Sequence, residues 1–201
     1  MLNYMLKNLK NKIAKISFRL ITIFLVICWV GLALCCLTMM YSKKYVYPLK
    51  YKELVFEYAD YYGLERALVF AVIKTESSFN PKAESRAGAI GLMQITKRTG
   101  EYIANKLGVE KYDLLDNSDN INFGCYYIKY LYVRFKDMNT AMVAYNAGEG
   151  NVSLWLMDEN LSTDGKTLKS IPFGESREYL NKIQKNFKKY KKLYKKILDK
   201  Y

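Results

Sequence analysis

The sequence predicts an all-α soluble domain that follows a membrane-spanning segment. The first observation is an apolar run from Leu20 to Met40 that contains no charged side chain. The second is that, behind this run, apolar residues recur at steps of three and four, which is the period of an α-helix. The third is that no stretch alternates apolar and polar residues as a half-buried strand does. A chain of 201 residues is long enough for one such domain with a single core.

The apolar run can cross a hydrocarbon layer about 30 Å thick, because an α-helix rises about 1.5 Å per residue. A cleaved signal peptide is the alternative, with Gly31 and Ala33 as the small residues of a cleavage site. Lysines flank the run on both sides, so the positive-inside rule favours a cytoplasmic N-terminus only slightly. We expect four segments: a basic cytoplasmic tail (1–19), a transmembrane anchor (20–41), a connector (42–49) and the soluble domain (50–201).

The composition excludes several kinds of site. The sequence contains no histidine, so catalytic triads built on histidine and zinc sites with histidine ligands are excluded. Three of the four cysteines lie in the apolar run, which leaves Cys125 alone in the soluble domain and excludes a disulfide within it. We expect neither a metal nor a cofactor. The net charge of +13 favours polyanionic partners such as anionic lipid headgroups, acidic wall polymers or nucleic acid.

Two helices are expected at the start of the soluble domain. The first runs from about Leu54 and ends at Gly63, since glycine suits the left-handed position after a helix. The second begins near Glu65 and ends near Ser77, because Asn80-Pro81 cannot continue it.

A loop of small and polar residues is expected from Asn80 to Gly91, where the backbone can approach a ligand closely. Leu92 then leads into a third helix that ends at Gly108.

The middle of the domain is predicted to contain two more helices. The first follows the run Asp116–Asn120, which is rich in residues that cap helices, and we interpret its Gly124 as a close helix crossing. The next is expected to be capped by Asn139 and to stop at Gly148. An exposed polar loop from 158 to 170 follows.

A last helix is predicted from Glu175 to the C-terminus. Its apolar face is formed by Ile183, Phe187, Tyr190, Tyr194, Ile197 and Tyr201. Nine lysines fill most of the remainder: Lys182, Lys185, Lys188, Lys189, Lys191, Lys192, Lys195, Lys196 and Lys200. The pattern fits a helix that faces lipid headgroups or another polyanion, or else a helix packed on the domain with a solvated basic back.

Glu76 is the candidate catalytic residue. It lies three and four residues after Ile73 and Val72, so it shares their apolar face near the end of its helix. Poor hydration and the negative end of the helix dipole both raise the pKa of a carboxyl group there. A carboxyl that keeps its proton at neutral pH can act as a general acid. The alternative is a structural ion pair with one of three nearby cations: Lys74, Arg86 or Arg98.

Four segments of this chain, in this order and spacing, resemble the catalytic domain of lytic murein transglycosylases. They are Glu76-Ser77-Ser78-Phe79 with Gly91-Leu92-Met93-Gln94-Ile95, Asn120-Ile121 with Gly124, Ala144-Tyr145-Asn146-Ala147-Gly148, and Ile171-Pro172-Phe173 with Glu175 and Tyr179. The resemblance covers about residues 49–183 and implies a lysozyme-like fold of the goose type. Unlike many relatives, this chain has Thr96 instead of proline after Met93-Gln94-Ile95, which changes the start of the next helix.

The resemblance implies cleavage of peptidoglycan between N-acetylmuramic acid and N-acetylglucosamine. Glu76 would protonate the bridging oxygen and then, as the carboxylate, take the proton of the muramoyl C6 hydroxyl, which leaves a 1,6-anhydro end. Enzymes that hydrolyse such bonds with two carboxylates are the ordinary case. A lysozyme-type hydrolase on the same fold and a non-catalytic wall-binding module are the alternatives. A nucleic-acid partner is not expected, because it would leave the four matching segments unexplained.

The resemblance also implies a set of substrate-binding residues: Ser77, Met93, Gln94, Tyr145, Asn146 and Glu175. Gln94 and the backbone around Met93 would bind the sugar's N-acetyl and hydroxyl groups, while Tyr145 and Asn146 would face the acid from across the cleft. Each also has a structural interpretation, for instance Ser77 as a helix-end cap. Because peptidoglycan lies outside the plasma membrane, the resemblance places the catalytic domain on the extracytoplasmic side of a single-pass anchor.

Overall fold

The computed structural model describes residues 1–199, with side chains in that range except those of residues 3, 4 and 7–14. The chain divides into two compact units, Met1–Pro48 and Leu49–Tyr201.

The N-terminal unit is helical. Helix α1 spans Leu2–Tyr41 and is followed by a short π-helix, η1, which spans Ser42–Val46. The expected anchor (20–41) lies inside this helix, while most of the segment expected as a connector (42–49) is η1. Within the described residues, Lys15–Val46 is the one stretch that is long and apolar enough to cross a membrane, with a mean hydropathy of 2.8 in its most apolar window. Its apolar side chains are exposed, as lipid-facing side chains are.

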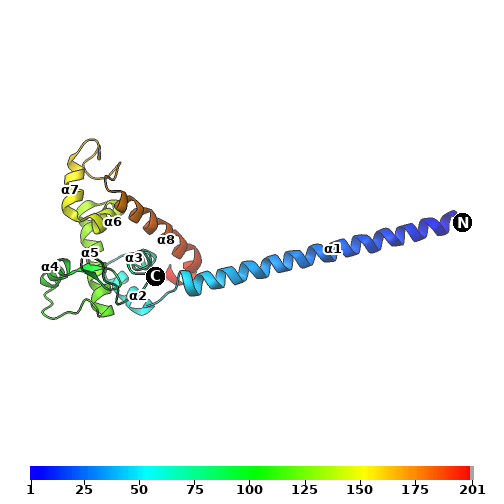
Figure 1. Ribbon diagram of the computed structural model, residues 1–201, viewed down its shortest axis with the longest axis horizontal. Helices are drawn as coiled ribbons and strands as arrows, with labels where there is room; N and C mark the ends of the chain where they lie inside the picture. The colour runs from blue at the N-terminus through cyan, green and yellow to red at the C-terminus, as the bar shows by residue number, and fades with distance from the viewer. Residues whose placement is uncertain (200–201) are drawn as a thin grey trace. The chain divides into compact units, whose positions relative to one another are not determined.

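The C-terminal unit is mostly helical, as predicted (Figure 1). Its helices are α2 (Lys52–Tyr61), α3 (Arg66–Glu76), α4 (Lys97–Leu107), α5 (Asn117–Phe135), α6 (Met138–Ala147), α7 (Glu149–Met157) and α8 (Gly174–Leu198). Two strands of two residues each, β1 (Ala89–Ile90) and β2 (Ile95–Thr96), pair antiparallel with Ala89 opposite Thr96. This small hairpin lies in the loop between α3 and α4.

Helix α3 forms the centre of the core. Its residues from Arg66 to Ile73 are all buried, and α8 packs along it (Figure 1). The ring of Phe70 stacks on that of Tyr190 with centroids 5.4 Å apart. Burial of a phenylalanine stabilises a fold by roughly 1.5–3 kcal/mol, so this contact is a substantial part of the α3–α8 interface. The core therefore fixes α3 over its length, up to its last residue, Glu76.

The third helix begins later than expected. Leu92 lies in a turn, and α4 starts only at Lys97 because β2 occupies the two residues before it. Thr96 is the N-cap, and its hydroxyl oxygen accepts a hydrogen bond from the backbone N–H of Thr99 at 3.2 Å. The threonine that stands where many relatives have proline thus caps the helix.

The prediction that Asn139 caps α6 is wrong. Asp137 is the N-cap, and its Oδ2 accepts a hydrogen bond from the backbone N–H of Thr140 at 2.7 Å. A carboxylate satisfies this free N–H and also interacts favourably with the positive end of the helix dipole. Asn139 lies inside the helix and accepts a hydrogen bond from Gln184.

Helix α8 departs from the predicted apolar face at its end. Ile183, Tyr190 and Tyr194 are buried as expected, but Ile197 is 41% exposed and Leu198 is buried in its place. Tyr194 has non-helical backbone angles (φ −128°, ψ 21°), so the residues after it are rotated relative to the first part of the helix. Lys200 and Tyr201, which were assigned to the same helix, lie outside the described residues.

Candidate active site

Glu76 is the last residue of α3, and its side chain is half-buried. The hydroxyl of Tyr179 donates a hydrogen bond to Glu76 Oε1 at 2.7 Å. Burial raises the pKa of the Glu76 carboxyl to about 7, and the hydrogen bond from Tyr179 partly opposes that shift because it stabilises the carboxylate. In the described part of the chain, Glu76 forms no ion pair, so the expected alternative partners Lys74, Arg86 and Arg98 do not engage it.

Helix α8 supplies Tyr179 because its first turns pack against the core. Ser176 and Tyr179 are three residues apart, lie on the same face and are both buried. The hydroxyl of Ser176 donates to Asn146 Oδ1 at 2.7 Å, which ties α8 to the end of α6. The amide nitrogen of Asn146 has no hydrogen-bond partner among the described residues.

Tyr145 comes close to Glu76 from α6. Burial and the charge of Glu76 raise the pKa of the Tyr145 phenol well above its usual range, so the hydroxyl keeps its proton. That hydroxyl donates to the backbone carbonyl of Met93 at 2.7 Å. Tyr145 therefore joins the end of α6 to the segment that carries Met93 and Gln94.

The Met93 segment is also fixed by Asn120 on α5, whose side chain is buried. Its Oδ1 accepts from the Met93 backbone N–H at 2.7 Å, and its Nδ2 donates to the carbonyls of Ile90 (2.9 Å) and Leu114 (2.8 Å). Gly91 lies against it with φ +80°, and a side chain at Gly91 would collide with the Asn120 amide. The Met93 N–H is thus already engaged by a side chain of the domain.

Gly124 on α5 does not mark a helix crossing, and that interpretation is wrong. The side chain of Met93 fills the space beside it, and an added Cβ would come within 2.8 Å of Met93 Cβ and closer still to its sulfur. The glycine is needed because a buried loop side chain, rather than another helix, lies against α5.

Gln94 has a left-handed backbone, with φ +52°. A side chain in this region strains the backbone, and such positions often lie at functional sites. Both hydrogens of the Gln94 amide are used, because Nε2 donates to the carbonyls of Ala83 (3.1 Å) and Gly91 (3.0 Å). Its Oε1 is the group left to accept a hydrogen bond from a ligand.

The structure places the two remaining candidates differently. The Ser77 hydroxyl donates to the carbonyl of Ile73 at 3.2 Å and accepts from the Phe79 N–H at 3.1 Å, so it caps the end of α3. Glu175 lies exposed in the first turn of α8, and within the described residues it forms no hydrogen bond or ion pair with the other candidates. Of the seven candidates, Glu175 is the one that the structure leaves apart.

Three residues that touch the site were not among the candidates. Tyr179 bonds to Glu76 directly, Ser176 orients Asn146, and Asn120 holds Met93. Tyr179 and Asn120 both lie in segments that carry the family resemblance, which was the signal available for them. Ser176 had no such signal.

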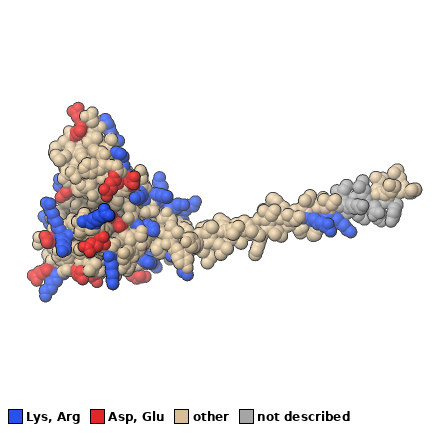
Figure 2. Space-filling view, viewed as in Figure 1, with Lys and Arg blue, Asp and Glu red and all other residues tan. Residues whose placement is uncertain are grey.

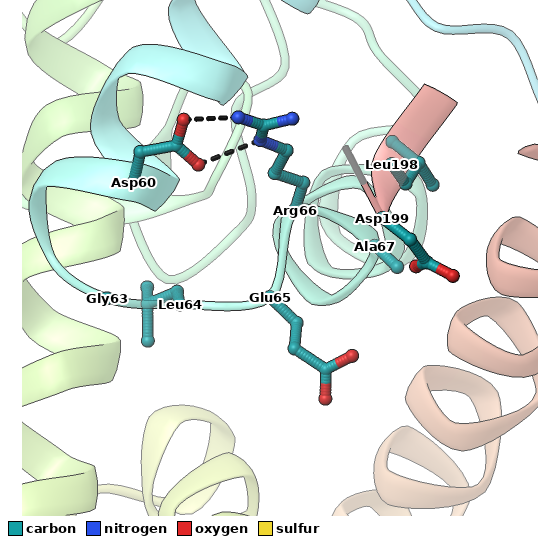
Figure 3. Close-up of a pocket in the computed structure, with 8 residues that line it drawn as sticks. All are labelled: Asp60, Gly63, Leu64, Glu65, Arg66, Ala67, Leu198 and Asp199. Atoms are coloured by element: carbon teal, nitrogen blue, oxygen red, sulfur yellow. Dashed lines mark hydrogen bonds and ion pairs between the residues drawn. The ribbon is translucent and has the colours of Figure 1, made fainter. Parts of the chain in front are cut away.

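Two surface hollows flank these elements. One, of about 400 Å³, lies at the start of α3, at the opposite end of that helix from Glu76 (Figure 3). There Arg66 reaches back to Asp60 in a two-pronged ion pair, while Glu65 points away from that pair. The second hollow, of about 440 Å³, is lined by Arg98, Thr99, Tyr102, Tyr127, Gly148, Glu149 and Gly150. It continues the site, because the ring of Tyr127 packs against that of Tyr145 at 5.5 Å.

A metal site is not apparent. In the part of the chain that the structure describes, no three Asp, Glu, Cys or His side chains come together as metal ligands.

Comparisons with known proteins identify relatives of this arrangement. Residues 53–167 match the family model described as "Transglycosylase SLT domain". The soluble lytic murein transglycosylase of Salmonella typhimurium is 34% identical over 143 residues, 68% of this chain and 22% of that protein. The membrane-bound lytic murein transglycosylase C of Pectobacterium atrosepticum is 33% identical over 168 residues, 70% of this chain and 47% of that protein.

Solved structures agree with the sequence matches. The 70-kDa soluble lytic transglycosylase of Escherichia coli superposes with a TM-score of 0.65 and 32% identity, covering 73% of this chain and 25% of that one. The lytic transglycosylase Slt of Pseudomonas aeruginosa, solved as an inactive variant with glutamine in place of a glutamate, gives a TM-score of 0.65 and 30% identity over 73% of this chain and 24% of that one. The chain thus spans a quarter or less of these soluble enzymes and about half of the membrane-bound relative.

Proposed function

This chain belongs to the transglycosylase SLT-domain family, and on that premise we propose that it is a lytic transglycosylase that cleaves the glycan strands of peptidoglycan. The observation that carries the proposal is the environment of Glu76. Its pKa near 7 keeps a large fraction of the carboxyl protonated at neutral pH, as a general acid requires. A solved relative that is inactive with glutamine in place of a glutamate supports a carboxyl as the essential group of the family.

In the proposed reaction, Glu76 donates its proton to the oxygen that links N-acetylmuramic acid to N-acetylglucosamine, and the bond from that oxygen to C1 of the muramoyl ring breaks. The resulting carboxylate then takes the proton from the C6 hydroxyl of the same ring, and O6 bonds to C1. The product is a 1,6-anhydro end, no water is consumed, and Glu76 regains its proton. This ring closure is the finer part of the proposal.

Ring closure, unlike hydrolysis by the two-carboxylate route, needs no second acid. Glycosidases that hydrolyse by the two-carboxylate route place a partner carboxylate about 5–9.5 Å from the acid. Within the described residues, no other carboxylate is among the groups that shift the pKa of Glu76. Its polar neighbours are the phenols of Tyr179 and Tyr145.

The substrate-binding roles are proposals that follow from the free polar atoms. Gln94 Oε1 is available to accept from the N-acetyl N–H or a hydroxyl of the sugar, and the amide nitrogen of Asn146 is available to donate. The Met93 carbonyl has one remaining lone pair beside Tyr145. Ser77 acts through the geometry of the α3 end. Glu175 would contact only a substrate that extends over the start of α8.

The chain is proposed to be anchored in the plasma membrane by residues 20–41, with the catalytic unit outside the cytoplasm. The apolar helix and the membrane-bound relative support the anchor. A peptidoglycan substrate requires the extracytoplasmic side.

Product analysis of purified sacculi tests the function. The chain is expected to release muropeptides that carry 1,6-anhydro ends, detected by mass spectrometry as products lighter by one water than hydrolysed ones. Glu76→Gln should lower release by at least about a thousandfold, since general acid catalysis contributes about 10²–10⁴ and the same side chain also serves as base. Unchanged circular dichroism of the variant is the control for folding.

Three outcomes would contradict the proposal in different ways. Reducing ends in place of anhydro ends would establish a hydrolase on this fold. Full release by the Glu76→Gln protein would exclude this residue as the acid. Binding to sacculi without release by either protein would indicate a wall-binding module.

A further inference from the structure

The exposed side of α8 carries a continuous row of positive charge. From Lys182 to Lys196, the exposed residues of the helix are all lysines. We call these residues the lysine ribbon: Lys182, Lys185, Lys188, Lys189, Lys192, Lys195 and Lys196, all of them exposed. Lysine and arginine side chains gather along the edge of the C-terminal unit where α8 runs (Figure 2).

The ribbon has little counter-charge of its own. No acidic residue occurs between Glu178 and Asp199, and within residues 1–199 as described the one ion pair of the ribbon is Lys182 with Glu178 at 3.9 Å. Lys191, on the flank of the helix, pairs with Glu65 and is not part of the ribbon. Lysines three and four residues apart repel each other, so an anionic surface along the row would relieve this repulsion. The row is about 20 Å long, at about 1.5 Å per residue.

The opposite side of α8 is already occupied. Ser176, Tyr179, Ile183, Tyr190 and Tyr194 are buried against the domain. The helix therefore has no apolar face to insert into a bilayer, and a lipid surface could engage it only through charge. Contact of this kind is reversible and weakens with salt, because exposed charges are screened beyond about 10 Å at 0.1 M ionic strength.

The anchor brings such a surface within reach. Eight residues, 41–48, separate the end of the apolar run from the first residue of the C-terminal unit, and even fully extended they span at most about 30 Å. A tether this short keeps the unit at a high effective concentration beside the bilayer, so a weak contact is populated. Each lysine near an anionic leaflet adds roughly fivefold to the affinity.

We infer that the lysine ribbon is a docking surface for the anionic phospholipid headgroups of the membrane in which the same chain is anchored. The inference rests on the anchor proposed above. Helix α8 also carries Tyr179, whose hydroxyl bonds to Glu76, so a docked ribbon fixes the orientation of the acid relative to the lipid surface. The short tether favours lipid over acidic wall polymers as the occupant.

Amine-reactive labelling of the full chain tests the docking. The chain is reconstituted in vesicles of phosphatidylcholine alone or with about one third phosphatidylglycerol, and the labelling rate of each lysine is read by mass spectrometry. The ribbon lysines should label about three- to tenfold more slowly in the anionic vesicles, and 0.5 M salt should abolish the difference. Lys106 and Lys111, which are exposed on and after α4, are the internal controls and should label equally in both.

A matched pair of variants separates the ribbon from total charge. Lys185→Gln, Lys188→Gln, Lys192→Gln and Lys195→Gln together should remove the protection of Lys189 and Lys196. Lys82→Gln, Lys106→Gln, Lys111→Gln and Lys166→Gln remove the same charge from exposed positions elsewhere and should leave that protection intact.

Docking would be overturned if the ribbon lysines labelled at the same rate in both kinds of vesicle. It would also be overturned if anionic vesicles slowed the labelling of Lys106 and Lys111 as much as that of the ribbon lysines. Protection that requires an added anionic wall polymer and not the lipid would overturn it in favour of the polymer. Release of the chain from vesicles by alkaline carbonate would refute the anchor and the docking together. Cleavage of sacculi by the same samples is measured separately, so a failure of the proposed activity is distinguishable from a failure of docking.

Discussion

Two opposing effects set the pKa of the Glu76 carboxyl group. Desolvation at the end of α3 favours the protonated acid, while the hydrogen bond from Tyr179 favours the carboxylate, and the balance leaves the pKa at about 7. A group that must first donate a proton and then accept one works best with such a value. The proposed reaction thus depends on both the burial and the tyrosine.

Substitution of Tyr179 by phenylalanine is expected to change the pH profile of cleavage. In the parent chain, the rate should fall above about pH 7, as Glu76 loses its proton. Tyr179→Phe removes the bond that lowers this pKa, so the fall should move to higher pH, with a loss of roughly tenfold or more at the optimum. Rates measured from pH 5 to 9 check this. A lower rate with an unshifted profile would show that Tyr179 has only a packing role.

Glu76 should also make folding stability depend on pH. Its pKa is raised from 4.5 to about 7 in the folded state, so between these values the folded chain holds a proton that the unfolded chain has lost. Stability is therefore complete below about pH 4.5 and declines as pH rises towards 7. Glu76→Gln removes this decline, and its stability relative to the parent should rise by up to about 3 kcal/mol between pH 4 and pH 8. Urea denaturation of residues 49–201 at both pH values measures it, and a relative stability that does not change with pH would contradict it.

The sequence made Glu76 a candidate acid but did not predict its hydrogen-bond partner. Helical periodicity placed the carboxyl on a buried face at a helix end, and the raised pKa follows from that position. Tyr179 is 103 residues away, so their contact depends on how α8 packs along α3, which no local pattern encodes. The same holds for Gln94, because its bonds to Ala83 and Gly91 depend on the fold of the loop.

At the scale of elements, the sequence predicted helices that have clear stripes or caps. Asp116 caps α5 through the N–H groups of Ser118 and Asp119, as its position indicated. Helix α7, Glu149–Met157, was not predicted. Its apolar residues, such as Val152, Leu154, Trp155 and Leu156, lie all around the helix and do not form one stripe. The strands β1 and β2 are two residues long, too short to show alternation.

Adding a single methyl group at Gly124 should disturb the contact between α5 and the loop that carries Met93. Gly124→Ala forces the Met93 side chain away and is expected to cost about 1–3 kcal/mol of stability by overpacking. It should also lower the cleavage rate, because the backbone carbonyl of Met93 accepts a hydrogen bond from Tyr145 in the candidate active site. Gly150→Ala is the matched control: it is also helical, meets nothing within 4 Å, and should be neutral or stabilising by up to about 1 kcal/mol. Thermal denaturation of both variants measures the difference, and equal melting temperatures would contradict it.

At the scale of the molecule, the two compact units suggest that the catalytic unit is self-sufficient. A chain that begins at Leu49 retains α2 to α8 and the whole core around α3. We expect it to be soluble without detergent, to unfold in one cooperative transition and to cleave sacculi. Circular dichroism during heating and the release assay measure this. Failure of the fragment to fold would show that Met1–Pro48 contributes to the stability of the core.

Most of this large-scale organisation followed from composition. The uncharged run predicted the long helix, and the absence of strand-like alternation predicted the helical class. The rotation of α8 after Tyr194 could not be predicted, because the residues that follow continue a regular helical pattern. The backbone angles of Tyr194 and the burial of Leu198 in place of Ile197 reveal the change.

The eight residues between the apolar run and the C-terminal unit also limit how far that unit can lie from the proposed membrane anchor. A unit of about 150 residues is about 40 Å across, and the link adds at most about 30 Å. Under the proposed anchoring and activity, the chain would reach only peptidoglycan that lies within about 70 Å of the bilayer. Newly exported glycan strands would then be its first substrates, and older peptidoglycan farther from the membrane would be out of its reach.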